Sequence, residues 1–219
     1  MDVLSPSPRK TLPSRGRATR EAILREGVAL ARAVGVSGLS IGGLAESVGM
    51  SKSGLFAHFG SKEELQIAVL QAAQDDFAET VLKPAFAEPR GLARLRAVIS
   101  RWVSWSTGNG QEGAGGCVVL AASHEFDDRP GIVRDYLLVV ETNMMAMLHR
   151  SIRQSIDTQE LPLDTDVAQF AYELFGTVMS AHFHTRLLRD PQASTRALTA
   201  FERLISHPPT LQTAAPIAG

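Results

Sequence analysis

The chain has a single cysteine, few aromatic residues and no long apolar run among its 219 residues. One cysteine excludes an intramolecular disulfide, and no apolar run has the length expected of a signal peptide or of a membrane-spanning helix. No HExxH sequence and no closely spaced pair of cysteines occurs, so neither a catalytic site nor a metal site is expected. These absences predict a soluble cytoplasmic protein that is not an enzyme and needs no cofactor.

Neither sign of charge dominates overall, but the two parts of the chain differ. The formal net charge is −1, whereas residues 1–62 carry nine Lys or Arg and four Asp or Glu, and residues 63–219 carry thirteen and nineteen. A basic segment followed by an acidic one is typical of a phosphate-binding module joined to a module that does not bind DNA. The alternative explanation is ordinary solvated surface charge. The motif described below favours a phosphate-binding module.

The first sixteen residues contain Pro6, Pro8 and Pro13 and show no apolar periodicity. This composition predicts a flexible basic arm over residues 1–16. The basic residues of the arm, together with Arg17 just after it, could reach a minor groove of DNA. Non-specific attraction to phosphates is the favoured role for these residues, which are Arg9, Lys10, Arg15 and Arg17.

Residues 40–65 predict two short helices, a tight turn and the start of a third helix. Leu44, Ala45 and Val48 lie on one apolar helix face, and Gly49 can take the left-handed conformation that ends a helix. A helix, a glycine turn and a second helix within so short a span are typical of the helix-turn-helix motif.

The second of these helices is expected to begin with Ser51 as its cap and to point Leu55 and Phe59 inward. Its other face is small, polar and basic, as expected of a helix that enters a DNA groove. Ser61 and Glu64 fit a reciprocal capping box, in which each side chain accepts a hydrogen bond from the other residue's backbone N–H. A third helix is therefore predicted to start at residue 62.

This segment resembles the DNA-binding domain of the tetracycline-repressor (TetR) family of bacterial transcription regulators. The family pattern is matched by Ser40, Leu44, Ala45, Gly49, Ser51, Phe56, His58, Phe59, Ser61, Lys62 and Leu65. Phe56 stands where the family usually has Tyr, so a hydroxyl that could reach a phosphate is absent. Gly42 and Gly43 each weaken their helix by about 1 kcal/mol relative to Ala.

The resemblance implies that residues 17–62 form the DNA-binding domain, and side-chain chemistry suggests a role for each exposed residue. Lys52, Ser53 and Gly54 are expected at the base edges, because Lys can reach guanine and Gly allows close approach. Phe56 is expected to pack against the sugar edge or the domain core. Four residues are candidates for phosphate contact, because they offer hydroxyls, positive charge or the backbone amides of a helix start: Ser40, Ser51, His58 and Lys62.

Residues 63–207 are predicted to form a larger helical domain, and residues 208–219 a disordered tail. Apolar residues recur at helical spacing over residues 62–82, 92–105, 117–126, 136–156, 164–188 and 194–205. Pro84 is expected to end the first of these helices. Together with the DNA-binding domain, the pattern predicts an all-α fold of about nine helices.

The resemblance also implies that the larger domain binds a small ligand and forms a homodimer. In the family the last two long helices form a four-helix bundle with the partner chain, and here they would be residues 164–188 and 194–205. Phe170, Phe175 and Phe183 belong to an apolar set larger than one core face needs, which favours an intersubunit face. An ordinary core helix is the alternative.

These features predict a transcriptional regulator that binds a palindromic operator on double-stranded DNA and is released when a ligand changes the spacing of its two DNA-binding domains. Repression relieved by the ligand is expected, and activation is the alternative. An apolar ligand pocket is expected, although the same residues would also make an ordinary core, around Trp102, Trp105, Cys117, Leu120, Phe126 and Met147.

Cys117 stands at the start of a predicted helix, and its surroundings resemble a subgroup of the family in which such a cysteine senses oxidants or electrophiles. A helix N-terminus lowers the pKa of a thiol and makes it reactive. A small apolar residue packed in the core is the favoured alternative.

Gly108, Gly110 and Gly113 spell GxGxxG and suggest an alternative function, a dinucleotide-binding enzyme. That role requires a strand before the first glycine, whereas residues 92–105 have helical periodicity. A loop between two helices is therefore the favoured interpretation.

Two pairs of potential metal ligands are spaced unsuitably. His182 and His184 lie two residues apart on a predicted helix and so face different directions, and His124 and Glu125 are adjacent. A structural or ligand-lining role is favoured over a metal site.

Overall fold

The computed structural model describes residues 14–108 and 116–211, which form an all-α molecule. The elements are α1 (Ser14–Val34), α2 (Ile41–Ser47), α3 (Lys52–Phe59), α4 (Lys62–Phe77), the π-helical segment η1 (Ala78–Leu82), α5 (Lys83–Phe86), α6 (Leu92–Thr107), α7 (Val118–Phe126), α8 (Ile132–Asp157), α9 (Val167–Arg186) and α10 (Ala193–Ser206). Because α4, η1 and α5 are consecutive, the described residues contain nine separate helical rods, as the sequence predicted.

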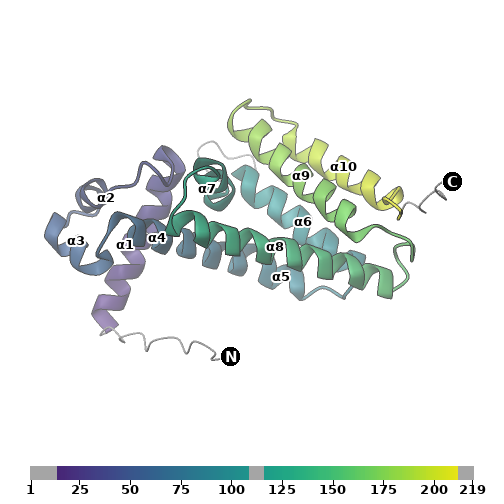
Figure 1. Ribbon diagram of the computed structural model, residues 1–219, viewed down its shortest axis with the longest axis horizontal. Coiled ribbons are helices and arrows are strands. Elements are labelled where there is room, and N and C mark those ends of the chain that lie inside the picture. The colour runs from purple at the N-terminus through teal and green to yellow at the C-terminus, as the bar shows by residue number, and fades with distance from the viewer. Residues whose placement is uncertain (1–13, 109–115, 212–219) are drawn as a thin grey trace, which may run out of the picture.

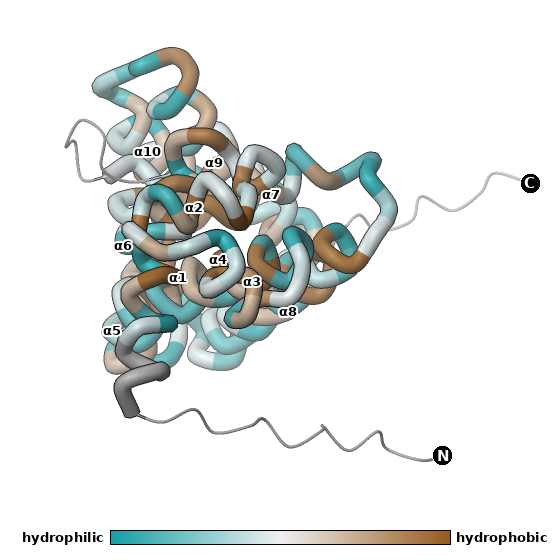
Figure 2. Tube along the Cα trace, turned by 90° about the vertical axis from the view of Figure 1, so that its left-hand side faces the viewer, coloured by the Kyte–Doolittle hydropathy of each residue, from teal (hydrophilic) through white to brown (hydrophobic). Residues whose placement is uncertain are grey.

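The helices gather into two regions along an elongated molecule (Figure 1). We call residues 14–60, with α1 to α3, the head, and residues 62–211 the body. The helix that begins with α4 leaves the head and runs into the body, where α6, α8, α9 and α10 lie alongside one another (Figure 1). Figure 2 views the molecule from the head end, with α2 and α3 in front of the body helices.

Local capping explains where the short helices of the head begin. The Ser40 hydroxyl accepts a hydrogen bond from Gly43 N at 3.0 Å, and the Ser51 hydroxyl accepts one from Gly54 N at 3.1 Å. Gly49, with φ of 66°, supplies the predicted left-handed residue between α2 and α3. The helix-turn-helix therefore forms from signals in its own sequence.

The capping box at α4 forms only in one direction. The Ser61 hydroxyl accepts a hydrogen bond from Glu64 N at 3.0 Å, as predicted. The return bond was predicted wrongly, because Ser61 N donates instead to Phe59 O at 2.8 Å. The Glu64 carboxylate lies beside Gly60, where an added Cβ would be 2.7 Å from it.

The head and body share one apolar core. Leu44, Leu55 and Leu65 are completely buried. Gly27 lets α1 approach α4 closely, since a Cβ there would lie 2.7 Å from Val69 Cγ2. The head is thus fixed on the start of α4 by burial rather than by a flexible linker.

The sequence predicted that Pro84 ends the first helix of the body, and this prediction was wrong. Lys83 N donates to Ala78 O, five residues back, in the widened turn of η1, and the rod then continues through α5 to Phe86. Proline has no N–H to donate, and the change from the π to the α pattern places it in the first turn of α5, where an N–H is not needed.

Both ends of the described chain differ from the prediction. Residues 14–16 belong to α1 rather than to the arm, and residues 1–13 lie outside the described residues. Part of the predicted tail is ordered, because Leu211 N donates to Asp164 O at 2.8 Å and Thr165 pairs with Thr210 in an antiparallel bridge. Residues 212–219 again lie outside.

Candidate nucleic-acid interface and ligand cavity

Helix α3 exposes the polar face that the sequence predicted. Leu55 and Phe59 are buried, whereas Lys52 and Ser53 are exposed. The Lys52 side chain passes over α2, with its Cε 4.0 Å from where a Cβ of Gly42 would lie. A methyl group at position 42 would make only an ordinary van der Waals contact with the lysine stem.

The remaining candidate DNA residues surround this face. Ser40 and Ser51 are exposed at the starts of α2 and α3, with hydroxyls that already cap the helices. His58 is half-buried near the end of α3. Phe56 is 53% exposed, so it does not pack in the domain core, which was one of its two predicted positions.

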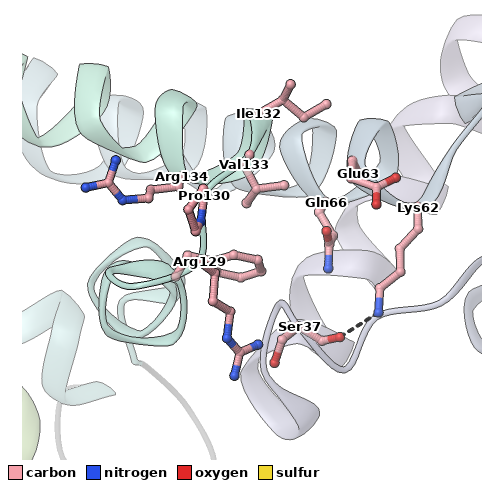
Figure 3. A pocket seen from close by; sticks show the side chains of 11 residues that line it. Ser37, Lys62, Glu63, Gln66, Arg129, Pro130, Ile132, Val133 and Arg134 are labelled. Atoms are coloured by element: carbon pink, nitrogen blue, oxygen red, sulfur yellow. Dashed lines mark hydrogen bonds between the residues drawn. The ribbon is translucent and has the colours of Figure 1, made fainter.

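Lys62 differs from the other candidates because its charge is turned toward the protein. Its Nζ donates a hydrogen bond to Ser37 O at 2.8 Å, in the loop between α1 and α2 (Figure 3). The residue is nevertheless exposed, so it contributes positive potential near the head while it holds the loop.

That loop is the junction between head and body. The Glu125 carboxylate, at the end of α7, accepts hydrogen bonds from Val36 N at 3.2 Å and Ser37 N at 2.7 Å. On the α4 side, Gln66 Nε2 donates to Val36 O at 2.7 Å. Figure 3 shows Gln66 and Lys62 reaching from α4 toward this loop, at the side of a pocket that Arg129 and Val133 also line. Body side chains thus hold both polar groups of the main chain at residues 36 and 37.

A separate cavity of about 300 Å³ lies in the body between α4, α6, α7 and α8. Five of the six predicted ligand residues line it, namely Trp102, Trp105, Cys117, Leu120 and Met147. The sixth, Phe126, lines the junction pocket instead, since α7 carries it toward Arg129 and the head. The cavity also has lining residues that the prediction missed: Gln74, Asp75, Phe77, Ala78, Leu82, Val119, Val140, Glu141, Asn143 and Met144.

Two polar groups of this cavity stand out. Burial raises the pKa of the Glu141 carboxyl, although a hydrogen bond from the Ser123 hydroxyl to its Oε1, at 2.8 Å, opposes the rise. Trp102 Nε1 is buried and has no hydrogen-bond partner among the described residues. The Glu141 carboxylate is therefore suited to a polar atom of a ligand, whereas the fully covered Trp102 Nε1 is a local cost to the fold.

Cys117 caps α7, but burial outweighs the effect of the helix. Its Sγ accepts a hydrogen bond from Leu120 N at 3.4 Å, as expected at a helix start. Burial nevertheless raises the pKa of the thiol to about 12. The lowered pKa that the sensor hypothesis requires is therefore not found, because burial of the thiolate outweighs its interactions at the helix start. The favoured alternative, a small residue packed in the core, agrees with the burial of Cys117.

Cys117 in the native protein should react very slowly with Ellman's reagent at neutral pH. A pKa of about 12 leaves roughly a thousandfold less thiolate than an unperturbed thiol has. The release of thionitrobenzoate can be followed in native protein and in guanidinium chloride, where the reaction should finish at once. A native rate equal to that of free cysteine would restore the oxidant-sensor hypothesis.

The histidine pairs have no metal-site arrangement. Among the described residues no group of three or more His, Cys, Asp or Glu could hold a metal ion. Burial, followed by the nearby charges of Arg186 and His124, lowers the pKa of His182 to about 4. His184 Nδ1 lies 3.6 Å from an oxygen of Asp190. A structural or ligand-lining role for these histidines stays a prediction.

The glycine spacing has no nucleotide-binding context. Gly108 is the left-handed residue that ends α6, so a helix and not a strand precedes it, while Gly110 and Gly113 lie outside the described residues. Residues 38–42 also match GxSxG, the pattern of the nucleophile elbow in hydrolases. That motif requires a strand before the serine, whereas Ser40 follows a loop after α1 and its hydroxyl caps α2.

Sequence reasoning missed the residues that act over long distances along the chain. Glu125 was considered only as a metal ligand, and Gln66 was not considered. The Glu125 contacts join residues 88 and 89 positions apart, for which no local pattern exists. Glu141 carries one signal, a carboxylate directly after four apolar residues of α8.

Comparison with known proteins agrees with this architecture. The family described as bacterial regulatory proteins, tetR family, matches residues 23–69, and the tetracyclin repressor-like C-terminal domain matches residues 91–201. The HTH-type transcriptional regulator TcmR of Streptomyces glaucescens is 29% identical over 187 residues, which cover 81% of this chain and 78% of TcmR.

Two solved structures show the same fold. A TetR transcriptional regulator from Chloroflexus aurantiacus J-10-FL superposes with a TM-score of 0.79 at 22% identity, covering 91% of this chain and 100% of that one. AibR, in complex with isovaleryl coenzyme A and operator DNA, gives a TM-score of 0.65 at 23% identity, covering 88% of this chain and 99% of AibR. No helix in the described residues is both long and apolar enough to cross a membrane. With both family domains in place on a helix-turn-helix head and a helical body, the chain belongs to the TetR family of bacterial transcription regulators.

Proposed function

We propose that the protein is a homodimeric repressor that binds a partly palindromic operator and releases it when a small molecule enters the body cavity. The observation that carries the proposal is the exposed polar face of α3, which stands at the free end of the head (Figure 2). In this arrangement α3 enters the major groove, and the two heads of a dimer occupy successive grooves.

The DNA contacts follow from the exposure of each side chain. Lys52 and Ser53 face the base edges, and Gly54 allows close approach because it has no side chain. The hydroxyls of Ser40 and Ser51 sit at helix starts, where backbone N–H groups and the helix dipole favour a phosphate.

Dimerisation is assigned to the outer face of α9 and α10. Tyr172, Phe183 and Leu187 on this side of the body are 73%, 50% and 67% exposed, more apolar surface than a free helix usually presents. Beside them runs an open groove of about 400 Å³ with a floor of small residues: Gly176, Ser180, Ala181, Ala193, Ala197 and Ala200. A helix of a second copy can pack closely on such a floor.

Helix α7 connects the cavity to the head. Its start lines the cavity through Cys117, Val119 and Leu120, and its end holds the main chain of residues 36 and 37 through Glu125. A ligand that shifts α7 therefore displaces the head through two hydrogen bonds. By linkage, operator DNA weakens ligand binding by the same factor.

Replacing Lys52 with Ala should lower operator affinity about ten- to hundredfold, because a base or phosphate contact to the charged group is lost. Fluorescence anisotropy with the DNA upstream of the protein's own gene, in excess unrelated DNA, measures the change. Lys83→Ala is the matched control, since Lys83 is an exposed lysine in α5 that pairs with Glu79. Equal affinities for both variants, or no specific site after selection from random duplexes, would contradict the proposal.

A further inference from the structure

The body cavity has an unbalanced charge. Its fifteen lining residues include the carboxylates Asp75 and Glu141, and none of them is Lys, Arg or His. Asp75 is exposed, whereas Glu141 is half-buried on α8. A pocket lined in this way opposes anionic ligands and favours cationic ones.

Glu141 has unused capacity to bind a donor. Its Oε1 accepts the hydrogen bond of the Ser123 hydroxyl, and its Oε2 accepts none from the described part of the chain. Burial disfavours its charged form, as the raised pKa indicates. A positively charged donor at Oε2 would compensate this cost, since an ion pair with a hydrogen bond stabilises the carboxylate.

Apart from the two carboxylates and the side-chain amides of Gln74 and Asn143, the cavity lining is apolar and aromatic. The rings of Trp102 and Trp105 both pack edge-on against Phe77, with centroids 5.5 and 5.2 Å away. Met144 and Met147 complete a wall that adapts to different shapes. Trp102 is only 2% exposed, so the surrounding core holds its ring in place.

These observations together specify a ligand chemistry. We propose that the cavity binds an apolar organic amine in its protonated form, with the ammonium group on Glu141 Oε2 and the apolar body against Phe77, Trp102 and Trp105. The aromatic rings add cation–π attraction to the same charge. This inference rests on the proposed function, because it names the class of effector that releases the operator.

The chain supplies its own probe for the test. Its two tryptophans are Trp102 and Trp105, and both line the cavity, so intrinsic fluorescence reports occupancy of this site. We would titrate the full-length protein with three compounds of one shape: 1-adamantylmethylamine, 1-adamantanemethanol and 1-adamantanecarboxylate. The amine should bind about tenfold or more tightly than the alcohol, and the carboxylate should bind most weakly.

Glu141→Gln tests the role of the carboxylate. The amide oxygen can still accept the Ser123 hydrogen bond, so the variant should fold, which far-ultraviolet circular dichroism checks. Its preference for the amine over the alcohol should fall to about twofold or less, with alcohol binding unchanged. Asp75→Asn, at the exposed carboxylate of the same cavity, should keep the wild-type preference.

Each contrary result has a clear meaning. A wild-type protein that binds the alcohol or the carboxylate as tightly as the amine, or binds none of the three, overturns the inference. An unchanged preference in Glu141→Gln also overturns it. Operator binding is measured separately with the DNA probe, so a protein that binds its operator without preferring the amine loses this inference alone, and one that binds no operator loses the proposed function.

Discussion

Gly176→Arg should convert the dimer into a monomer and lower its affinity for the full operator roughly hundredfold or more, because two linked heads lose their joint binding. Within the described part of the chain, a Cβ added at Gly176 finds open space, so the new side chain can leave α9 without a clash at its base. Replacing a glycine inside α9 even favours the helix, by up to about 1 kcal/mol. The damage would fall only on a second copy packed in the groove, where a charge loses its water.

Sedimentation at micromolar protein concentration measures the change in oligomeric state, and anisotropy with full and half operators measures the affinity. The control is Ala93→Arg, which places the same side chain at an exposed position of α6. A Gly176→Arg protein that remains dimeric would show that the α9 and α10 face is not the interface. A monomer that binds the palindrome with wild-type affinity would contradict the role of the dimer in operator binding.

Trp102→Ala should lower the free energy of unfolding by about 3–5 kcal/mol, the usual cost of truncating a large buried aromatic side chain. Trp102 is 2% exposed and contacts the rings of Phe77 and Phe175, so its removal enlarges a cavity that already exists. The substitution also removes a buried Nε1 that has no hydrogen-bond partner among the described residues, which offsets part of this destabilisation. The expected value therefore lies toward the lower end of the range.

Trp105→Ala is the matched comparison, because Trp105 lines the same cavity and contacts Phe77 but is only half-buried. Its cost should be about 1–2 kcal/mol. Guanidinium unfolding followed by circular dichroism, at one fixed dimer concentration, gives both values. Equal costs for the two variants would show that the core does not depend on the burial of Trp102.

The sequence predicted the features that have local causes. The caps at Ser40 and Ser51 and the turn at Gly49 each arise from residues within a few positions, and each was confirmed. Pro84 misled the prediction because one widened turn changes the hydrogen-bond pattern before it, and no residue type announces such a turn.

The candidate ligand site was predictable only as a set of apolar residues. Periodicity placed Trp102 of α6 and Leu120 of α7 on inward faces. It could not show that Phe126, at the end of α7, lines the junction pocket instead of the cavity. The raised pKa of Cys117 could not be predicted for the same reason, since a helix start is visible in the sequence and the extent of burial by distant helices is not.

The junction has a consequence for the exchange of domains. The body recognises residues 36 and 37 through their backbone N–H and C=O groups, so the contact does not depend on the Ser37 side chain. What the loop must keep is its path: Gly35 has φ of 77°, and a Cβ at Gly38 would lie 2.4 Å from Val34 O. A foreign head that preserves this loop should therefore connect to the same body and obey the same effector, which makes the chain a starting point for hybrid regulators with a new operator.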